Sequence, residues 1–208
     1  MEKITSEIIS LTALVTAICS LVIAIKKIKK ELEETLPQKI KRQCNIDLEI
    51  VNRLEEIKEF LSADRVQIYD FHNGGHYANG RSALKTSCTY EVCRIGVESC
   101  QMYMQSIPLN CIPHFIQTLL NSKILKINNL EELKQIMPAT YTLKKSQGIK
   151  SFYDVVLNNK NGDPIGFIAF QYNEPSKVNF AENEINEILR LKFFIEENLE
   201  KMISKKRK

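Results

Sequence analysis

Residues 148–173 read GIKSFYDVVLNNKNGDPIGFIAFQYN, and this stretch predicts a β-hairpin. Two runs of apolar, β-branched and aromatic residues, 152–157 and 165–172, flank a polar segment that contains Asn161 and Gly162. An Asn-Gly pair readily accepts the positive φ angles of a tight turn. Pro164 stands at the strand entrance, where its missing N–H costs least. Because both runs are apolar at nearly every position, we expect a sheet that is covered on both faces.

The composition is that of a globular protein, with 44% hydrophobic and 26% charged residues in a chain of 208. This length allows about one domain of ordinary size beside a membrane segment and a linker. The net charge of +4 comes partly from clusters at 26–30 and 205–208. Basic residues elsewhere are mixed with acidic ones, so we predict no nucleic-acid interface. The six cysteines include no Cys-x-x-Cys pair and indicate free thiols in a reducing compartment, and we expect neither a metal nor a cofactor.

Residues 8–25, IISLTALVTAICSLVIAI, form an uncharged apolar run that predicts a transmembrane helix. As a helix the run would span roughly 27 Å, close to the hydrocarbon thickness of a bilayer. Dense positive charge follows the run at 26–30, where it would oppose export, so an anchor is favoured over a cleaved signal peptide. The positive-inside rule places residues 1–7 outside and the domain in the cytoplasm, in a single-pass protein of the inner membrane. A buried apolar helix is the alternative.

The remaining segments alternate between helical and strand patterns. Residues 26–44 form a charged, helix-favouring linker that Pro37 is expected to interrupt. A second helical pattern covers about 40–61, and its apolar stripe suits either a cover for the sheet or a coiled-coil seam between subunits. The stripe consists of Ile50, Leu54, Ile57 and Leu61. Strands are predicted at 65–71, 88–97 and 124–127, and helices at 112–121, 129–137, 141–147 and about 180–204.

This α+β order with mainly antiparallel pairing resembles a GAF domain over about residues 45–203. The resemblance rests on LSADRVQIYDF at 61–71, on IPHFIQTLLNSKILKINNL at 112–130, and on the hairpin with its helix entry at 148–184. Gly148, Ser151, Gly166 and Phe180 fall in register with the family pattern, whereas the segment 72–87 and Asp154 depart from it. The chain also resembles membrane-anchored single-GAF proteins of bacterial or phage type.

The resemblance implies a GAF/PAS-like six-stranded antiparallel sheet flanked by helices. The first and last helices would pack on one face, and shorter helices and loops would form a small-molecule pocket on the other. Such domains often dimerise through the first and last helices. We therefore expect a short N-terminus at 1–7, a membrane helix at 8–25, a linker at 26–44, a GAF-like domain at 45–204 and a basic tail at 205–208.

The segment 72–87, HNGGHYANGRSALKTS, is predicted to be a loop rich in hydrogen-bond donors. Its glycines let a backbone approach a ligand, and its Arg and Lys supply positive charge, so it suits an anionic ligand such as a nucleotide. A solvated loop with glycines for turns is the alternative, and the polar residues on the strands could serve a structural hydrogen-bond network. The candidate ligand-binding residues are Tyr69, His72, Asn73, Gly74, Gly75, His76, Arg81, Lys85, Ser87, Tyr90, Glu91 and Asp154.

Together these patterns predict a membrane-tethered, non-catalytic sensor that binds a small anionic ligand or a protein partner, as a homodimer. One alternative is a thiol-based redox enzyme of the GAF fold, similar to the methionine sulfoxide reductases, that would use Cys88, Cys93 or Cys111. The other is a purely structural dimerisation module. An interior filled by side chains above Tyr69 and Phe71 would favour that last alternative.

Overall fold

The computed structural model describes residues 14–27 and 35–203, and the chain divides into two compact units, residues 1–45 and 46–208. In the first unit residues 14–27 are helical, and the Ser20 hydroxyl donates a hydrogen bond of 2.9 Å to the carbonyl oxygen of Thr16. Among the described residues, no helix is both long enough and apolar enough to cross a membrane. Residues 1–13 (with part of the expected span), 28–34 and 204–208 (with the expected basic tail) lie outside the described residues.

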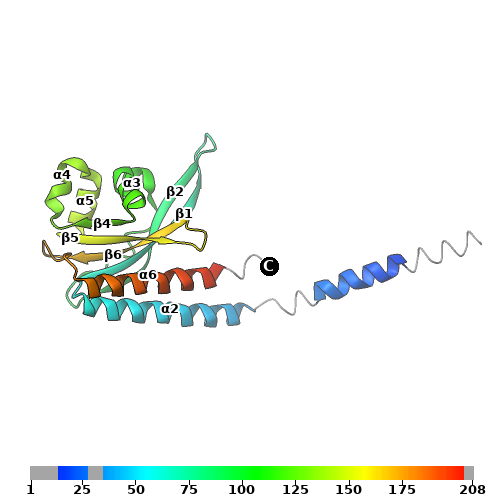
Figure 1. The fold of residues 1–208 in the computed structure, drawn as a ribbon. Coiled ribbons are helices and arrows are strands. Elements are labelled where there is room, and N and C mark those ends of the chain that lie inside the picture. Colours follow the sequence, from blue (N-terminus) through cyan, green and yellow to red (C-terminus); the bar gives the residue numbers. More distant parts are fainter. Residues whose placement is uncertain (1–13, 28–34, 204–208) are drawn as a thin grey trace, which may run out of the picture. The chain divides into compact units, whose positions relative to one another are not determined.

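The second unit is built on an antiparallel sheet with helices on both faces (Figure 1). Within the described residues the six strands lie in the order β3-β2-β1-β6-β5-β4. The strands are β1 (Arg65–His76), β2 (Ser82–Cys93), β3 (Ile107–Pro108), β4 (Ile124–Ile127), β5 (Ser151–Asn158) and β6 (Pro164–Tyr172). The helices are α2 (Leu36–Phe60), η1 (Leu109–Cys111), α3 (Pro113–Ser122), η2 (Leu130–Glu132), α4 (Leu133–Ile136), α5 (Pro138–Ser146) and α6 (Glu182–Ile203).

The predicted hairpin is confirmed as β5 and β6, which pair from Ser151 with Tyr172 to Asn158 with Pro164. Gly162 takes a φ of +84° in the connecting turn, a conformation that L side chains rarely adopt. Both strands are buried along most of their length, as their continuous apolar runs predict. A Cβ atom on Gly166 of β6 would lie 2.1 Å from the Tyr69 carbonyl oxygen, so this glycine permits close pairing with β1.

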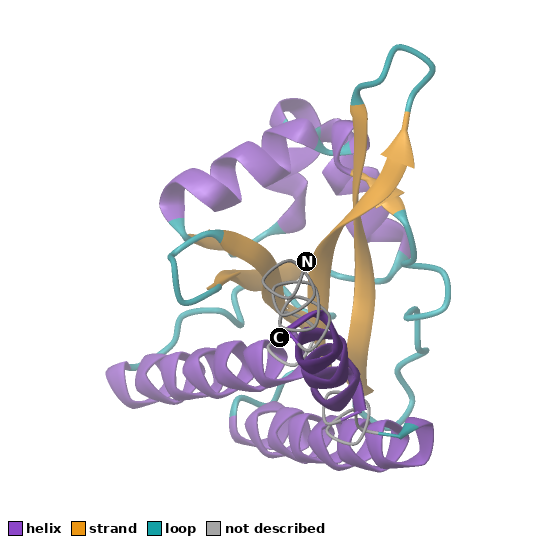
Figure 2. Ribbon diagram, turned by 90° about the vertical axis from the view of Figure 1, so that its right-hand side faces the viewer, coloured by secondary structure: helices purple, strands orange, loops and turns teal. Residues whose placement is uncertain are grey.

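The core is divided by the sheet into two clusters of buried apolar side chains in the described part of the chain. Val66 and Ile68 of β1 point into the cluster that α6 and residues 46–60 of α2 cover, whereas Tyr69 points into the cluster beneath α3 and α5. This alternation follows from the two-residue period of a strand. Figure 2 shows the two long helices on one side of the sheet and the shorter helices on the other.

The apolar stripe of α2 is a cover for the sheet, and the coiled-coil alternative is therefore wrong. Ile50 and Leu54 are fully buried, in one cluster with Ile188 and Ile195 of α6. Pro37 lies in the first turn of α2, where a proline lacks only an N–H that the helix does not use. Pro37 thus stands at the beginning of α2, which starts four residues before the expected position 40, whereas residues 28–34 of the linker that Pro37 was expected to interrupt lie outside the described residues.

The segment 72–87 was predicted to be a loop, but in the structure most of it forms two strands. β1 continues to His76, β2 begins at Ser82, and only residues 77–81 make the turn of a long hairpin. His72 pairs with Lys85, and Asn73 pairs with Leu84. The pattern missed these strands because their side chains are mostly exposed and polar, so no burial signal marks them. Accordingly, the strand predicted at 88–97 begins six residues earlier and ends at Cys93.

The predicted elements between β2 and β5 agree better with the structure. The strand at 124–127 is confirmed as β4, and the helix at 112–121 is confirmed as α3 within one residue at each end. The helix predicted at 129–137 is divided into η2 and α4, and the Asn129 side chain caps the first by accepting from the Glu131 N–H. The two-residue strand β3 was missed because so short an element leaves no period in the sequence.

Replacement of Leu54 tests whether the α2 stripe belongs to the domain core. Leu54→Ala in the full-length chain should lower the free energy of unfolding by about 2–5 kcal/mol, because a fully buried side chain leaves a cavity. Leu48→Ala on the same helix, where the leucine is 60% exposed, should change it by less than about 0.5 kcal/mol. Urea unfolding followed by circular dichroism measures both. Equal losses would contradict the assignment of the stripe to the core.

Candidate functional site

A cavity of about 20 Å³ lies between the sheet and the helices α3 and α5. It is on the face opposite α2 and α6, since its wall residues belong to the cluster beneath α3 and α5. One water molecule needs about 10–15 Å³ of such space, whereas drug-sized ligands occupy pockets of about 300–1,000 Å³. The lining residues are Tyr69, Thr86, Met104, Ile107, Ile112, Phe115, Thr140, Leu143, Lys144, Gln147 and Phe167.

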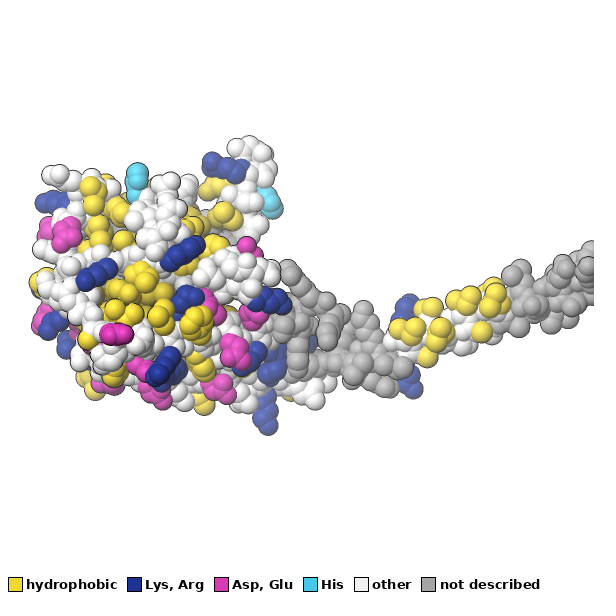
Figure 3. All heavy atoms as spheres, in the orientation of Figure 1, with side chains coloured by type: hydrophobic (Ala, Val, Ile, Leu, Met, Phe, Trp, Pro, Cys, Tyr) yellow, Lys and Arg dark blue, Asp and Glu magenta, His cyan; other side chains and the backbone are white. Residues whose placement is uncertain are grey.

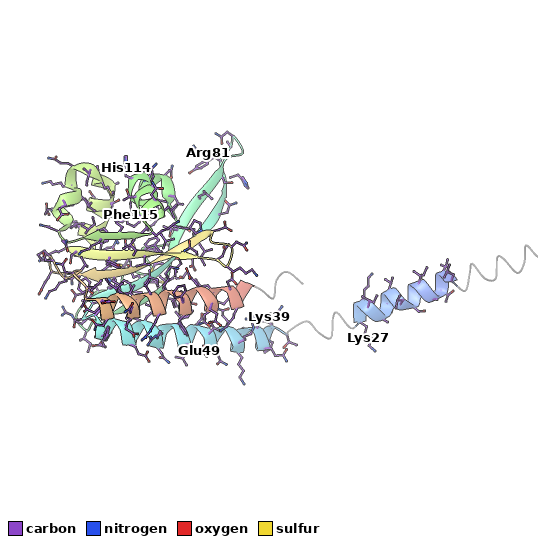
Figure 4. All side chains as sticks on the ribbon, viewed as in Figure 1. Lys27, Lys39, Glu49, Arg81, His114 and Phe115 are labelled. Atoms are coloured by element: carbon purple, nitrogen blue, oxygen red, sulfur yellow. The ribbon has the colours of Figure 1, made fainter. Side chains whose placement is uncertain are left out.

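Three aromatic rings fill the space beside this cavity. Tyr69 of β1 and Phe167 of β6 are partners across the sheet, and their rings stack with centroids 4.7 Å apart. Phe115 of α3 meets the Phe167 ring edge-on at 5.6 Å. Figure 4 shows Phe115 pointing from α3 towards the sheet while His114 points away from it. The rings leave a small space bounded mostly by apolar side chains.

Lys144 of α5 supplies the charge in the cavity wall. Its side chain is 8% exposed, and its Nζ atom donates to Asp154 Oδ2 of β5 at 3.3 Å. The same ammonium group lies 4.3 Å from the centroid of the Phe152 ring, a favourable cation–π position. Burial raises the pKa of Asp154 to about 6, although the nearby Lys144 charge lowers it in part. The pair therefore holds together a helix and a strand within the apolar layer.

Two buried oxygen atoms at this site have no hydrogen-bond partner among the described residues. One is Thr86 Oγ1, on a cavity-lining residue that is 1% exposed. The other is Asp154 Oδ1, on a residue that is fully buried. A buried polar group without a partner costs about 1–3 kcal/mol. Such an atom is rare in a folded protein and often marks a place where a water, an ion or a ligand binds.

A second buried polar group lies on the same face of the sheet but away from the cavity. Glu91 of β2 pairs with Arg65 of β1, with Oε1 and Nε 3.2 Å apart. The Glu91 carboxylate also accepts from Gln67 and from the backbone N–H groups of Cys100 and Gln101. Burial alone would raise the pKa of Glu91, but these donors together with Ser99 lower it. Glu91 thus anchors the segment after β2 to the sheet, in line with the structural interpretation of this residue.

The hairpin residues proposed for ligand binding do not come together around the cavity. Thr86 lines it, so its neighbours Lys85 and Ser87 project to the other side of the strand. The Ser87 hydroxyl is 2.8 Å from His72 Nε2. Five of the proposed residues are exposed on the outer part of the hairpin, and Figure 4 shows Arg81 at its far end. These five are Asn73, Gly74, Gly75, His76 and Arg81.

Of the proposed residues, Tyr69 lines the cavity and Asp154 lies behind Lys144. Tyr90 is on the opposite face, where its hydroxyl donates to Asp47 of α2, so its assignment to a pocket with Tyr69 was wrong. The prediction missed Lys144, Thr86 and the other lining residues. One signal was present: a carboxylate such as Asp154 in an apolar strand requires a buried cation, and Lys144 is on the apolar side of a predicted helix.

The cysteine thiols of the core are poorly suited to react. Burial raises the pKa of Cys88 strongly and that of Cys100 to about 11, and burial also raises the pKa of Cys93. With raised pKa values these thiols are protonated at neutral pH. Because the thiolate is the reactive form of cysteine, they are poor nucleophiles. Cys111 is exposed in η1. Within the described ranges, no group of three or more His, Cys, Asp or Glu side chains could hold a metal ion.

Known proteins were compared with both the sequence and the structure. The sequence matches no family model, and no curated protein matches it. The structure is similar to the blue-light absorbing form of the PixJ GAF domain of Thermosynechococcus elongatus, with a TM-score of 0.58 and 16% identity over 83% of this chain and 96% of that one. It is also similar to the phycocyanobilin-bound GAF domain of a cyanobacterial phytochrome, with a TM-score of 0.54 and 16% identity over 84% of this chain and 90% of that one.

A third similar structure is a domain of a putative two-component sensor histidine kinase protein from Sinorhizobium meliloti 1021. Its TM-score is 0.50, and the 16% identity extends over 74% of this chain and 90% of that one. Identities this low establish the fold alone. The sheet order, the two long helices on one face and these similarities lead to one conclusion: the second unit of this chain has the GAF fold.

Proposed function

We propose that this protein is a non-catalytic binding module that takes up a small molecule in the cavity beneath α3 and α5. The observation that carries the proposal is the buried Thr86 hydroxyl, which has no partner in the described structure and belongs to a residue that lines the cavity together with Lys144. A few polar groups that converge in an apolar cavity are the usual form of a small-molecule site. The GAF fold, shared with a sensor histidine kinase domain, is consistent with such a role.

The cavity sets an upper limit on ligand size in this conformation. At about 20 Å³ it has room for little more than one water molecule, so a nucleotide does not fit. The expectation of a nucleotide-like ligand at 72–87 is therefore replaced by a smaller ligand at Lys144. The same filled interior above Tyr69 and Phe71 supports the alternative of a structural dimerisation module, treated below.

A thiol-based enzyme is the weaker alternative. The raised pKa values of Cys88, Cys93 and Cys100 work against thiolate chemistry at neutral pH. Arg94, the basic residue that follows Cys93 in the sequence, pairs with Asp64 at 2.6 Å. These settings favour a binding role over a catalytic one.

A cavity-filling variant tests the ligand proposal. The full-length chain, purified in a mild detergent, is screened against small alcohols, amides and acids by thermal unfolding. A ligand present at one hundred times its Kd should raise the free energy of unfolding by about 2.7 kcal/mol. Thr140→Ile should abolish the gain, because Thr140 is buried in the cavity wall and the larger side chain occupies the space.

The matched control is Thr142→Ile, two residues further along α5, where the side chain is exposed. This variant should keep the full ligand response. Native mass spectrometry of the same preparation shows whether a small molecule is already bound. A bare protein that responds to no compound, or a ligand response that survives in Thr140→Ile, would refute the proposal.

We also propose that residues 8–25 anchor the protein in the inner membrane with the GAF-fold domain in the cytoplasm. The apolar run and the basic residues that follow it carry this part. In the described portion, large apolar side chains on the helix at 14–27 are exposed, Leu21 at 61% and Ile23 at 67% among them (Figure 3). Such a surface in water is unfavourable and requires a cover.

Alkaline carbonate extraction of cell membranes tests the anchor. The unaltered chain should stay in the membrane pellet, whereas the double variant Val15→Arg, Ile18→Arg should move to the supernatant. Each arginine near the centre of a membrane helix costs about 3 kcal/mol. Leu36→Arg is the control, because Leu36 is equally apolar and 70% exposed but lies outside the run. A wild-type chain released by carbonate would rule out the anchor.

The second candidate is a homodimer formed through the layer of α2 and α6. Each helix presents an exposed aromatic side chain, Phe60 at 49% and Phe193 at 64% exposure. Large exposed apolar side chains of this kind favour contact with another protein surface.

Sedimentation velocity of the full chain in detergent tests the dimer. It should show a dimer that Phe193→Lys converts to a monomer. Ile136→Lys is the control, since Ile136 is 63% exposed on α4, on the other side of the sheet. A monomeric wild-type protein, or a dimer indifferent to Phe193→Lys, would exclude this interface.

A further inference from the structure

We propose that the ligand of this cavity is a small monovalent anion, which binds Lys144 in place of Asp154 while Asp154 takes up a proton. The inference rests on the proposed function, because it concerns the same cavity, and it adds the chemical class of the ligand and a coupling to pH.

Two of the residues that line the cavity, Lys144 and Thr86, can donate hydrogen bonds to an anion. Lys144 carries three N–H donors, and within the described residues its hydrogen-bond acceptor is Asp154 Oδ2. Thr86 lines the same cavity, and its buried hydroxyl has no hydrogen-bond partner among the described residues. A hydroxyl and an ammonium group can both donate to one small anion. Hydrogen bonds to a charged partner are about twice as strong as neutral ones.

The apolar remainder of the wall sets the size and the charge of the ligand. Ile107, Ile112 and Phe167 offer nothing to a second charged group, so a monovalent anion suits the site better than a phosphate with two charges. The volume of about 20 Å³ limits the anion to a few atoms, such as nitrate, nitrite or a halide. An anion in this space would accept a hydrogen bond from the Thr86 hydroxyl.

Asp154 competes with such an anion for Lys144. An added negative charge beside a buried carboxylate would be strongly unfavourable, because like charges repel in a medium of low polarity. Uptake of one proton by Asp154 removes this cost. Before binding the site holds one positive and one negative charge. After binding it holds Lys144 with its positive charge, a neutral Asp154 and the anion, so its net charge stays zero.

The surroundings of Asp154 make the protonated form accessible. Its pKa is raised by burial to about 6, and Lys144 is the charged group that acts on it in the described structure. Its partners in the sheet are Leu125 on β4 and Ala169 on β6, neither of which ionises. Tyr69 on β1 stays neutral at these pH values, because burial raises its pKa well above the ordinary value. Protonation of Asp154 also removes the negative charge from a carboxyl group whose Oδ1 atom has no partner in the described structure.

The direction of the pH effect follows. Above a pH of about 6 Asp154 is ionised and must be protonated before the anion binds, so the affinity should fall roughly tenfold for each pH unit. Below that pH the affinity should level off.

Nitrate is the probe, because its charge does not change between pH 5 and 8. The full-length chain in detergent is titrated with sodium nitrate at several pH values, with gluconate to keep the ionic strength constant. Methyl NMR signals of Ile107 and Ile112 report on the cavity, and the exposed Ile136 is the internal reference. We expect saturable shifts at Ile107 and Ile112, with an affinity that is higher at pH 5.5 than at pH 7.5.

Three substitutions with one control complete the test. Lys144→Gln should weaken nitrate binding at least about tenfold, and Thr86→Val should weaken it several-fold, as expected for the loss of a charged and a neutral donor. Asp154→Asn should bind nitrate with no dependence on pH, because the competing carboxylate is gone. Lys145→Met, at the neighbouring exposed lysine of α5, should bind nitrate like the unaltered protein.

The outcomes separate this inference from the proposed function. If neutral compounds shift Ile107 and Ile112 but nitrate does not, the cavity binds ligands and the anion is excluded. If nitrate binds Lys144→Gln as well as wild type, or if its affinity does not fall as the pH rises, the exchange with Asp154 is wrong. If neither kind of compound shifts these signals, both proposals fail. Should Lys144→Gln fail to fold, Thr86→Val and Asp154→Asn still decide.

Discussion

The close pairing of β1 with β6 is the constraint on which the rest of the domain depends. These strands lie at the centre of the sheet and join the N-terminal β1–β2 hairpin to the C-terminal β5–β6 hairpin. Gly166 permits the approach, because any side chain there would collide with the Tyr69 carbonyl. The same register stacks Tyr69 on Phe167, which forms the floor of the cavity. The geometry of the candidate site is thus set by one backbone contact.

A sheet covered on both faces has to pair every polar side chain that it buries. On the cavity side this is achieved twice by charge, with Arg65 on Glu91 and Lys144 on Asp154. The two pairs differ in their completeness. Glu91 accepts additional hydrogen bonds from Gln67 and from two backbone N–H groups, whereas Asp154 keeps one oxygen atom without a partner in the described structure. The first pair holds the segment after β2 in place, and the second leaves one carboxylate oxygen atom able to accept a further hydrogen bond.

The parts of the fold that could be predicted are those where burial leaves a period in the sequence. The β5–β6 hairpin, α3 and β4 follow from apolar runs, an Asn-Gly turn and a proline in a first helical turn. The strands at 72–87 could not be predicted, because a protruding hairpin buries little and its side chains carry no alternation. For the candidate site, the sequence analysis named Tyr69, which lines the cavity, and Asp154, which pairs with Lys144. Lys144 and Thr86 were missed because they come together only when α5, β2 and β5 pack in the folded domain. No local sequence pattern indicates that packing.

The retained polar groups argue that the cavity is more than a packing defect. A core with only a structural task would be more stable with a valine in place of Thr86, since the two side chains have similar shapes and valine has no hydroxyl to satisfy. Replacing the Lys144–Asp154 pair by apolar side chains of similar volume is likewise often neutral or stabilising. Thr86 and Lys144 line one cavity, and Asp154 lies behind Lys144. Six buried side-chain oxygen and nitrogen atoms of the described residues lack a hydrogen-bond partner, and the Thr86 hydroxyl is the one of these that belongs to a cavity-lining residue. That position favours a binding role for the cavity over a packing defect.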